Sequence, residues 1–196
     1  MAAPGRTPPP AAKPAGKTVR VHRLVQTVAR TPDANDPHRS GEAVTAARQR
    51  AIDLLLQALP EDTDDPAGWP VWRVLLPHAT AVFEHTDPAD DTSAVSVLLD
   101  RTGDFLPGQG TLSQAIGYFQ RALACDERMP GPDHPDTLAS RNNLAGAYQD
   151  AGDLTRAIPL LQQTLTDCER VLGAEHPITK TVRNNLKAIT QHRKQK

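Results

Sequence analysis

The second half of the chain repeats itself at a fixed spacing of 42 residues. His134-Pro135 returns as His176-Pro177, and Asn142-Asn143-Leu144 returns as Asn184-Asn185-Leu186. Because the spacing does not drift, no insertion separates the copies. A period of this size is typical of stacked supersecondary units, each of which buries its apolar face against its neighbours. The sequence therefore predicts a repeat array over residues 91–196.

Each copy is predicted to fold as two antiparallel helices, which makes the fold class all-α. In the clearest copy the first helix is expected over 135–150 and the second over 154–172, with Gly152 in the turn between them. Aromatic residues make up only 4% of the chain, so Leu and Ala, which favour helices, must supply the packing. The last helix, over about 178–193, has no second helix after it and is expected to act as a polar cap.

Five positions of the clearest copy follow the tetratricopeptide pattern: Leu144, Ala145, Tyr148, Ala157 and Leu161. The chain resembles that family over roughly residues 91–196. The 42-residue period, the Asn-Asn-Leu sequence and the GxxHP links at 131–135 and 173–177 resemble the kinesin-light-chain subtype. The resemblance implies about two and a half helical-hairpin repeats in a right-handed superhelical solenoid. A HEAT-type array, with a similar period, is the alternative, but it does not demand these small and aromatic positions.

The N-terminal half resembles a different kind of segment. Residues 21–26 (VHRLVQ), 54–72 and 75–85 are similar to the segment that precedes the repeats in actinobacterial NB-ARC–tetratricopeptide proteins, which are signalling ATPases of the STAND class. The resemblance places Val21-His22-Arg23 at the family's MHD motif, whose histidine contacts the nucleotide phosphates. Because this sequence lacks the ATPase core, His22 is interpreted as a relic nucleotide contact in a chain related to a signalling regulator.

Three segments are expected along the chain. Residues 1–17 are a basic, Pro- and Ala-rich arm that cannot bury enough apolar surface to offset its ordering entropy, so disorder is expected. Residues 18–90 are read as a divergent helical segment, with a short strand within 18–30. Residues 91–196 hold the repeats. Since about three repeats are needed for a stable array, the divergent helices are expected to stack on the first repeat.

The charge is unevenly distributed. Residues 1–30 and 180–196 each carry six basic residues and no acid, whereas the middle carries ten arginines and 23 acids, a net charge of −13. Either the basic ends are simply solvated, or the acidic body attracts a basic partner. An acidic folded part without interleaved aromatic residues argues against nucleic acid. The acidic stretches 61–65 and 87–91 lack EF-hand spacing and are expected to be solvated loops.

No arrangement of residues typical of catalysis or metal binding is visible. Cys125 and Cys168 are two lone thiols without a disulfide framework, which fits a cytoplasmic location. None of the seven histidines has metal-ligand spacing; His134 and His176 are expected to cap or fill the repeat links. No apolar run approaches the roughly 18 residues that a membrane span needs. We therefore expect no enzyme activity, no metal or cofactor, and no membrane association.

The candidate site lies on the first helix of each copy. In tetratricopeptide arrays these helices line the concave surface, where Asn side chains commonly bond an extended peptide, because an amide both donates and accepts. By resemblance, the peptide-binding residues are Asn142, Asn143, Gln149, Asn184 and Asn185, with Arg101 at an Asn position of the first copy. The equally weighted alternative is that these Asn residues only bridge neighbouring helices.

The sequence thus predicts a protein-interaction module that binds a peptide or protein partner on the concave surface. One alternative is a structural segment that forms a homodimer through the C-terminal helix, whose apolar face carries Val182, Leu186 and Ile189. An accessory or small enzyme on a helical scaffold is a third and weaker alternative, because no catalytic residue can be named.

Overall fold

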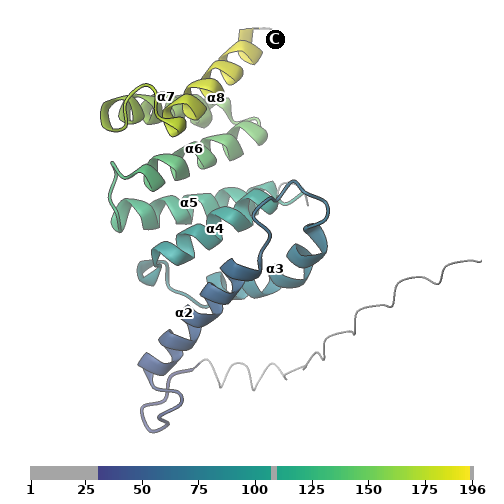
Figure 1. Cartoon of the computed structure of the whole chain (residues 1–196), viewed down its shortest axis with the longest axis vertical. Coiled ribbons are helices and arrows are strands. Elements are labelled where there is room, and N and C mark those ends of the chain that lie inside the picture. Colours follow the sequence, from purple (N-terminus) through teal and green to yellow (C-terminus); the bar gives the residue numbers. More distant parts are fainter. Residues whose placement is uncertain (1–30, 107–109, 195–196) are drawn as a thin grey trace, which may run out of the picture. The chain divides into compact units, whose positions relative to one another are not determined.

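The computed structural model describes residues 31–106 and 110–194, and this part of the chain is all-α, as predicted (Figure 1). The helices in chain order are α2 (Gly41–Ala58), α3 (Trp69–Glu84), the short 3-10 helix η1 (Pro88–Asp90), α4 (Ser93–Phe105), α5 (Leu112–Arg128), α6 (Pro135–Asp150), α7 (Leu154–Val171) and α8 (Pro177–Lys194). The described residues include no strand. The expected arm (1–17), the expected strand within 18–30, and His22 lie outside the described residues.

The chain divides into two compact units, residues 1–46 and 47–196. In the described part of the first unit, the guanidinium of Arg39 pairs with Asp33 (2.8 Å) and Asp36 (2.9 Å). These two ion pairs close the turn that precedes α2. The second unit contains the rest of α2 and all later helices.

Within the second unit, α4 to α8 stack in chain order, and α6 also contacts α8 directly (Figure 1). The pairs α4/α5 and α6/α7 are the two helical hairpins, and α8 is the first helix of a third copy. We call α4, α6 and α8 the A helices, and α5 and α7 the B helices. Helix α6 has the bounds that the period predicts, and α7 ends at Val171, one residue before the expected end.

The GxxHP link ends each B helix in the same way. Gly131 and Gly173 have positive φ angles of 101° and 86°, a conformation that Gly adopts without steric cost. The hydroxyl of Thr137 donates to the carbonyl of Gly131 (2.7 Å), and that of Thr179 donates to the carbonyl of Gly173 (2.8 Å). The link is therefore bonded to the first turn of the following A helix in both copies.

The histidine of the link caps the A helix that follows it. Nδ1 of His134 accepts a hydrogen bond from the backbone N–H of Asp136 (3.2 Å), and Nδ1 of His176 accepts one from the N–H of Ile178 (3.3 Å). The proline after each histidine occupies a first-turn position, where its missing N–H costs little. The predicted capping role of these histidines is confirmed.

A first apolar cluster joins α2, α3, α4 and α5. Trp72 of α3 is fully buried and stacks on Phe105 of α4, with ring centroids 4.8 Å apart and planes inclined by 9°. Ile52 and Leu55 of α2 belong to the same cluster. The helices before the repeats thus contribute large apolar side chains to the core of the first copy.

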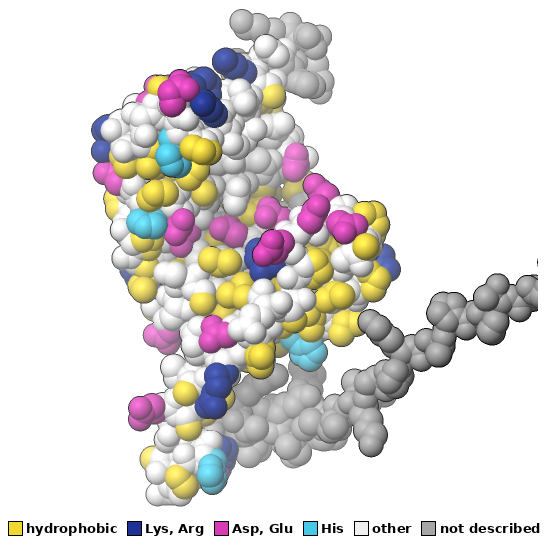
Figure 2. All heavy atoms as spheres, viewed as in Figure 1, with side chains coloured by type: hydrophobic (Ala, Val, Ile, Leu, Met, Phe, Trp, Pro, Cys, Tyr) yellow, Lys and Arg dark blue, Asp and Glu magenta, His cyan; other side chains and the backbone are white. Residues whose placement is uncertain are grey.

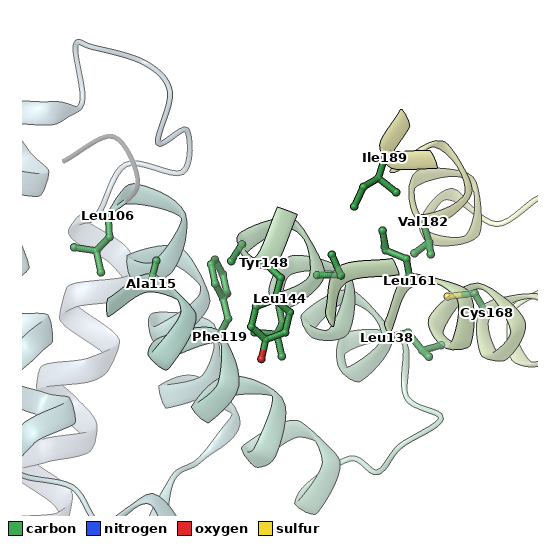
Figure 3. Packing of buried hydrophobic residues seen from close by; sticks show 13 residues of the cluster. Leu106, Ala115, Phe119, Leu138, Leu144, Tyr148, Leu161, Cys168, Val182 and Ile189 are labelled. Atoms are coloured by element: carbon green, nitrogen blue, oxygen red, sulfur yellow. The ribbon is translucent and has the colours of Figure 1, made fainter. Parts of the chain in front are cut away.

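A second apolar cluster runs from the end of α4 to α8 (Figure 3). Ala115, Ala145 and Ala157 are fully buried in it, as expected where small residues let helices cross closely. Val182 and Ile189 of α8 are only 0% and 2% exposed. The apolar face that suggested a homodimer through the C-terminal helix is therefore largely covered within this chain, and that suggestion loses its basis.

Asp91 is buried rather than solvated, so the prediction of a solvated loop over 87–91 is wrong at this residue. Its carboxylate is 2% exposed and accepts two hydrogen bonds from the guanidinium of Arg121, at 2.6 and 2.8 Å. The same guanidinium donates to the carbonyls of Phe83 (2.7 Å) and Thr86 (2.9 Å). One α5 side chain therefore satisfies both the buried carboxylate and the open C-terminal end of α3.

An ion pair between each B helix and the next A helix recurs with the period. Arg141 of α6 donates to Glu127 of α5 (3.0 Å), and Arg183 of α8 donates to Glu169 of α7 (2.9 Å). Arg141 also bonds Asp167 (3.0 Å) and is 8% exposed. These contacts join consecutive hairpins at the same place in both copies.

Candidate protein-interaction surface

The A helices present two equivalent positions of the repeat on one surface. The first position holds Asp100, Asn142 and Asn184, and the second holds Arg101, Asn143 and Asn185, in α4, α6 and α8 respectively. Asn184 is exposed, and Gln149 is exposed two turns along α6 from Asn142. Five of the six predicted residues thus belong to the directly contacting helices α6 and α8.

One pair of the predicted asparagines bridges two A helices. The Nδ2 group of Asn185 in α8 donates to Oδ1 of Asn142 in α6, at 2.9 Å. This hydrogen bond is the one expected if the asparagines bridge neighbouring helices. It uses one N–H of Asn185 and one lone pair of Asn142. Each amide retains further hydrogen-bonding capacity, and Asn184 remains exposed beside the bridge. The bridge therefore fixes the orientation of two half-buried amides.

Arg101 is bonded to the end of α2. Its guanidinium donates to the carbonyls of Leu56 (2.9 Å) and Leu59 (2.7 Å), in the region where a helix leaves carbonyls without intrahelical donors. Repeat register alone placed Arg101 among the groove residues, because the end of α2 lies outside the repeated part. A peptide contact through Arg101 stays a prediction. It could use only those N–H groups of the guanidinium that are not bonded to the carbonyls of α2.

The α4 end of this surface is acidic. Asp104 lies one turn after Arg101 and is exposed, but desolvation by the surrounding protein, and to a lesser extent the charge of Asp64, raise its pKa to about 6. Asp104 is thus a carboxyl group that solvent reaches although protein surrounds part of it. No ion pair within the described part of the chain neutralises it. Figure 2 shows further acidic side chains around the loop between α2 and α3, which carries Asp64.

Sequence reasoning missed Asp104 and the neighbouring Val97, which is 49% exposed. The signal was present in the helical spacing, since Val97, Arg101 and Asp104 recur at intervals of four and three residues on one face.

Neither cysteine has the environment of a reactive thiol. Cys125 and Cys168 are buried, and desolvation raises the pKa of both thiols, which disfavours the nucleophilic thiolate. Among the described residues there is no group of three or more potential metal ligands. No helix in the same part of the chain is long and apolar enough to cross a membrane. His22 lies outside the described residues, and its nucleotide contact stays a prediction.

Residues 137–178 match the tetratricopeptide repeat family, a stretch that covers α6, the hairpin turn, α7 and the start of α8. Its length equals one period of the sequence. Together with the stacked hairpins, this match defines the class: the chain folds as an all-α helical repeat solenoid of the tetratricopeptide type. Repeats of this type generally mediate protein–protein interaction.

Three further proteins resemble parts of this chain. Nephrocystin-3 of Mus musculus is 35% identical over 66 residues, which are 34% of this chain and 5% of that protein. The crystal structure of BtubC (BKLC) from P. vanneervenii superposes with a TM-score of 0.53 at 14% identity, covering 76% of this chain and 65% of that one. A Podospora anserina kinesin-light-chain structure with nearly identical TPR-like repeats has a TM-score of 0.49 at 20% identity, covering 88% and 75%. The chain thus spans only a small part of nephrocystin-3 and slightly less than two thirds of BtubC.

Proposed function

We propose that the chain is a protein-interaction module whose A helices bind an extended peptide segment of a partner protein. The observation that carries the proposal is the row of amides on α6 and α8, in which the Asn185–Asn142 bond holds two side chains in place beside the exposed Asn184. A pre-ordered amide loses less conformational entropy on binding than a mobile one. Asn143 and Gln149 extend the same row along α6.

The partner segment that fits this surface best is basic. The middle of the chain is strongly acidic, and Asp104 offers an exposed carboxylate that has no ion-pair partner among the described residues. Exposed Val97, two turns away on α4, adds apolar contact. A Lys or Arg side chain of the peptide would pair with Asp104, while its backbone would bond the amides of α6 and α8.

The wider setting is proposed from the resemblance of residues 21–26, 54–72 and 75–85 to the segment before the repeats in NB-ARC–tetratricopeptide proteins. On that basis the module serves a cytoplasmic signalling regulator of the STAND class, as in actinobacteria. The alternative is a structural segment without its own ligand.

The amides can be tested by separating ligand contact from helix bridging. Asn184→Ala removes an exposed amide, whereas Asn185→Ala breaks the bond to Asn142. We expect Asn184→Ala to weaken binding to peptides selected from a random display library by about 5- to 20-fold, as loss of one or two hydrogen bonds would. Its melting temperature should remain unchanged. Fluorescence polarisation with the selected peptides measures the affinity.

Gln162→Ala and Gln163→Ala provide the matched control, since both amides are exposed on α7, a B helix. They should leave binding unchanged. If all the Asn and Gln variants bind selected peptides equally, the ligand does not use the amide row. If only Asn185→Ala weakens peptide binding, and the loss of affinity parallels a loss of stability, the asparagines only bridge the helices.

The acidic end predicts how binding responds to pH. Because the pKa of Asp104 is about 6, its carboxylate is charged at pH 7.5 and mostly protonated at pH 5. We expect affinity for Lys- or Arg-containing peptides to fall as the pH is lowered through 6, and Asp104→Asn to be weak at both values. Equal pH profiles for wild type and Asp104→Asn would remove Asp104 from the site.

A further inference from the structure

A buried serine links two carboxyl groups where the first copy meets the second. Oγ of Ser140, on α6, lies 2.6 Å from Oδ2 of Asp126 on α5 and 3.1 Å from Oδ2 of Asp100 on α4. Ser140 and Asp126 are 1% and 4% exposed. The other carboxyl oxygen of Asp100, Oδ1, is buried and has no hydrogen-bond partner among the described residues. We call this cluster the carboxyl joint.

The joint cannot satisfy its hydrogen bonds without an added proton. A serine hydroxyl has one hydrogen, so it can donate to only one of two carboxylates. The shorter contact has the length of a charge-assisted O–H···O⁻ bond, which identifies Asp126 as the acceptor. The remaining contact becomes a hydrogen bond only when Asp100 is protonated and donates to the serine oxygen. With Asp100 ionised, two oxygen atoms with lone pairs face each other in a buried place.

We propose that the carboxyl joint is a pH-sensitive coupling between the first and second repeats, closed when Asp100 is protonated and loosened when it ionises. The proposal concerns how firmly α6 is held on the α4/α5 hairpin, and it is independent of which partner the array binds.

The charges around Asp100 favour the protonated form. Burial is the largest cause and, with the negative charges of Asp126 and Asp104, raises the pKa of Asp100 to about 7, while Ser140 and Asn143 of α6 oppose the rise. The guanidinium groups nearest in sequence are bonded elsewhere, Arg101 to the α2 carbonyls and Arg141 to Glu127 and Asp167. On α5, Arg121 and Arg128 bond Asp91 and the η1 segment. The charged or titratable side chains of α3 and of its C-cap residue are exposed: Arg73, His78, Glu84 and His85.

The equivalent positions of the later copies hold other residues. The positions that correspond to Asp126 and Ser140 one period later hold Cys168 and Val182, which are fully buried members of the apolar cluster. The position of Asp100 holds the neutral amides Asn142 and Asn184. The joint between the second copy and α8 therefore contains no carboxyl group at these three positions.

The direction of the effect follows from the raised pKa. Asp100 ionises near pH 4 in the unfolded chain but near pH 7 in the folded chain. Its contribution therefore favours folding most at or below about pH 4, is lost progressively as the pH rises to about 7, and is constant above that. Asp100→Asn removes this dependence, because the amide donates to Ser140 at every pH.

The test compares the melting temperatures of the full chain and its Asp100→Asn variant from pH 5 to pH 8.5. We expect the variant to melt within about 2 °C of wild type at pH 5 and about 3 to 6 °C above it at pH 8.5. Titration of ¹³C-labelled aspartate carboxyls by NMR should show one signal with a midpoint near pH 7 that is absent from the variant.

A second variant keeps the test decisive. Asp126→Asn removes the nearer negative charge and lets Ser140 donate to Asp100, so the Asp100 midpoint should fall by at least one pH unit. Asp104→Asn, one turn along α4, should lower the Asp100 midpoint less than Asp126→Asn does, because the charge of Asp104 acts on Asp100 more weakly than that of Asp126. An Asp100 midpoint near 4 in wild type, or a melting-temperature difference that does not change with pH, would overturn the proposal.

Discussion

Replacing Arg121 with alanine is expected to destabilise the protein by about 3–5 kcal/mol, the cost typical of leaving one partner of a buried ion pair uncompensated. The change leaves the Asp91 carboxylate without its two hydrogen bonds and removes the donors to the carbonyls of Phe83 and Thr86. Urea unfolding followed by circular dichroism at pH 7.5 gives the difference in unfolding free energy.

Arg170→Ala is the matched control for this prediction. Its guanidinium also bonds two carboxylates, those of Asp133 and Asp167, but 55% of the side chain is exposed. Solvent screens an exposed ion pair, so we expect Arg170→Ala to destabilise the protein much less than Arg121→Ala does. Equal losses for the two variants would show that the burial of Asp91 does not decide the cost.

The glycines of α4 and α5 are expected to respond to alanine in opposite directions. A Cβ atom at Gly103 would lie 2.8 Å from Cζ of Phe119, whose ring is 3% exposed and held in the core. The ring must shift, and we expect Gly103→Ala to cost about 1–2 kcal/mol net of its gain in helix propensity. Gly117 has no atom within 4 Å of the corresponding point, and Gly117→Ala should stabilise by up to about 1 kcal/mol.

Thermal and urea unfolding of the two glycine variants measure both differences under one condition. The pair separates steric crowding from helix propensity, since the residue change is identical and only the surroundings differ. A stabilised Gly103→Ala variant would mean that the α4–α5 crossing has room that the packing against Phe119 does not show.

The repeated part of the fold could be predicted because each copy carries its own boundary signals. Gly131 and His134 stop one helix and start the next by local hydrogen bonds, and Gly173 and His176 do so again. Such contacts join residues close in the chain, so the sequence pattern contains them. The helices α6 and α8 therefore begin within a residue of the expected positions.

Contacts that do not recur could not be predicted in this way. Arg121 binds residues 30 to 38 positions earlier, and one period later its place is taken by the exposed Gln163. Arg101 likewise bonds the end of α2, 42 and 45 residues before it. Both partners lie in or beside the helices that precede the repeats, where the period gives no register. The amide row was located by the period, but its bond between Asn185 and Asn142 depended on side-chain geometry.

The contact between the first and second copies differs in chemistry from that between the second copy and α8. This difference limits how the array can gain further repeats. In a solenoid each unit is stabilised through its nearest neighbours, so a tandem duplicate of one full period, residues 135–176, would set Cys168 beside a second Ser140. That hydroxyl would face a thiol, without the Asp126 carboxylate that accepts its proton in the original setting. Neighbouring units of this chain are therefore not interchangeable, and growth by duplication requires that both residues of a joint be exchanged together.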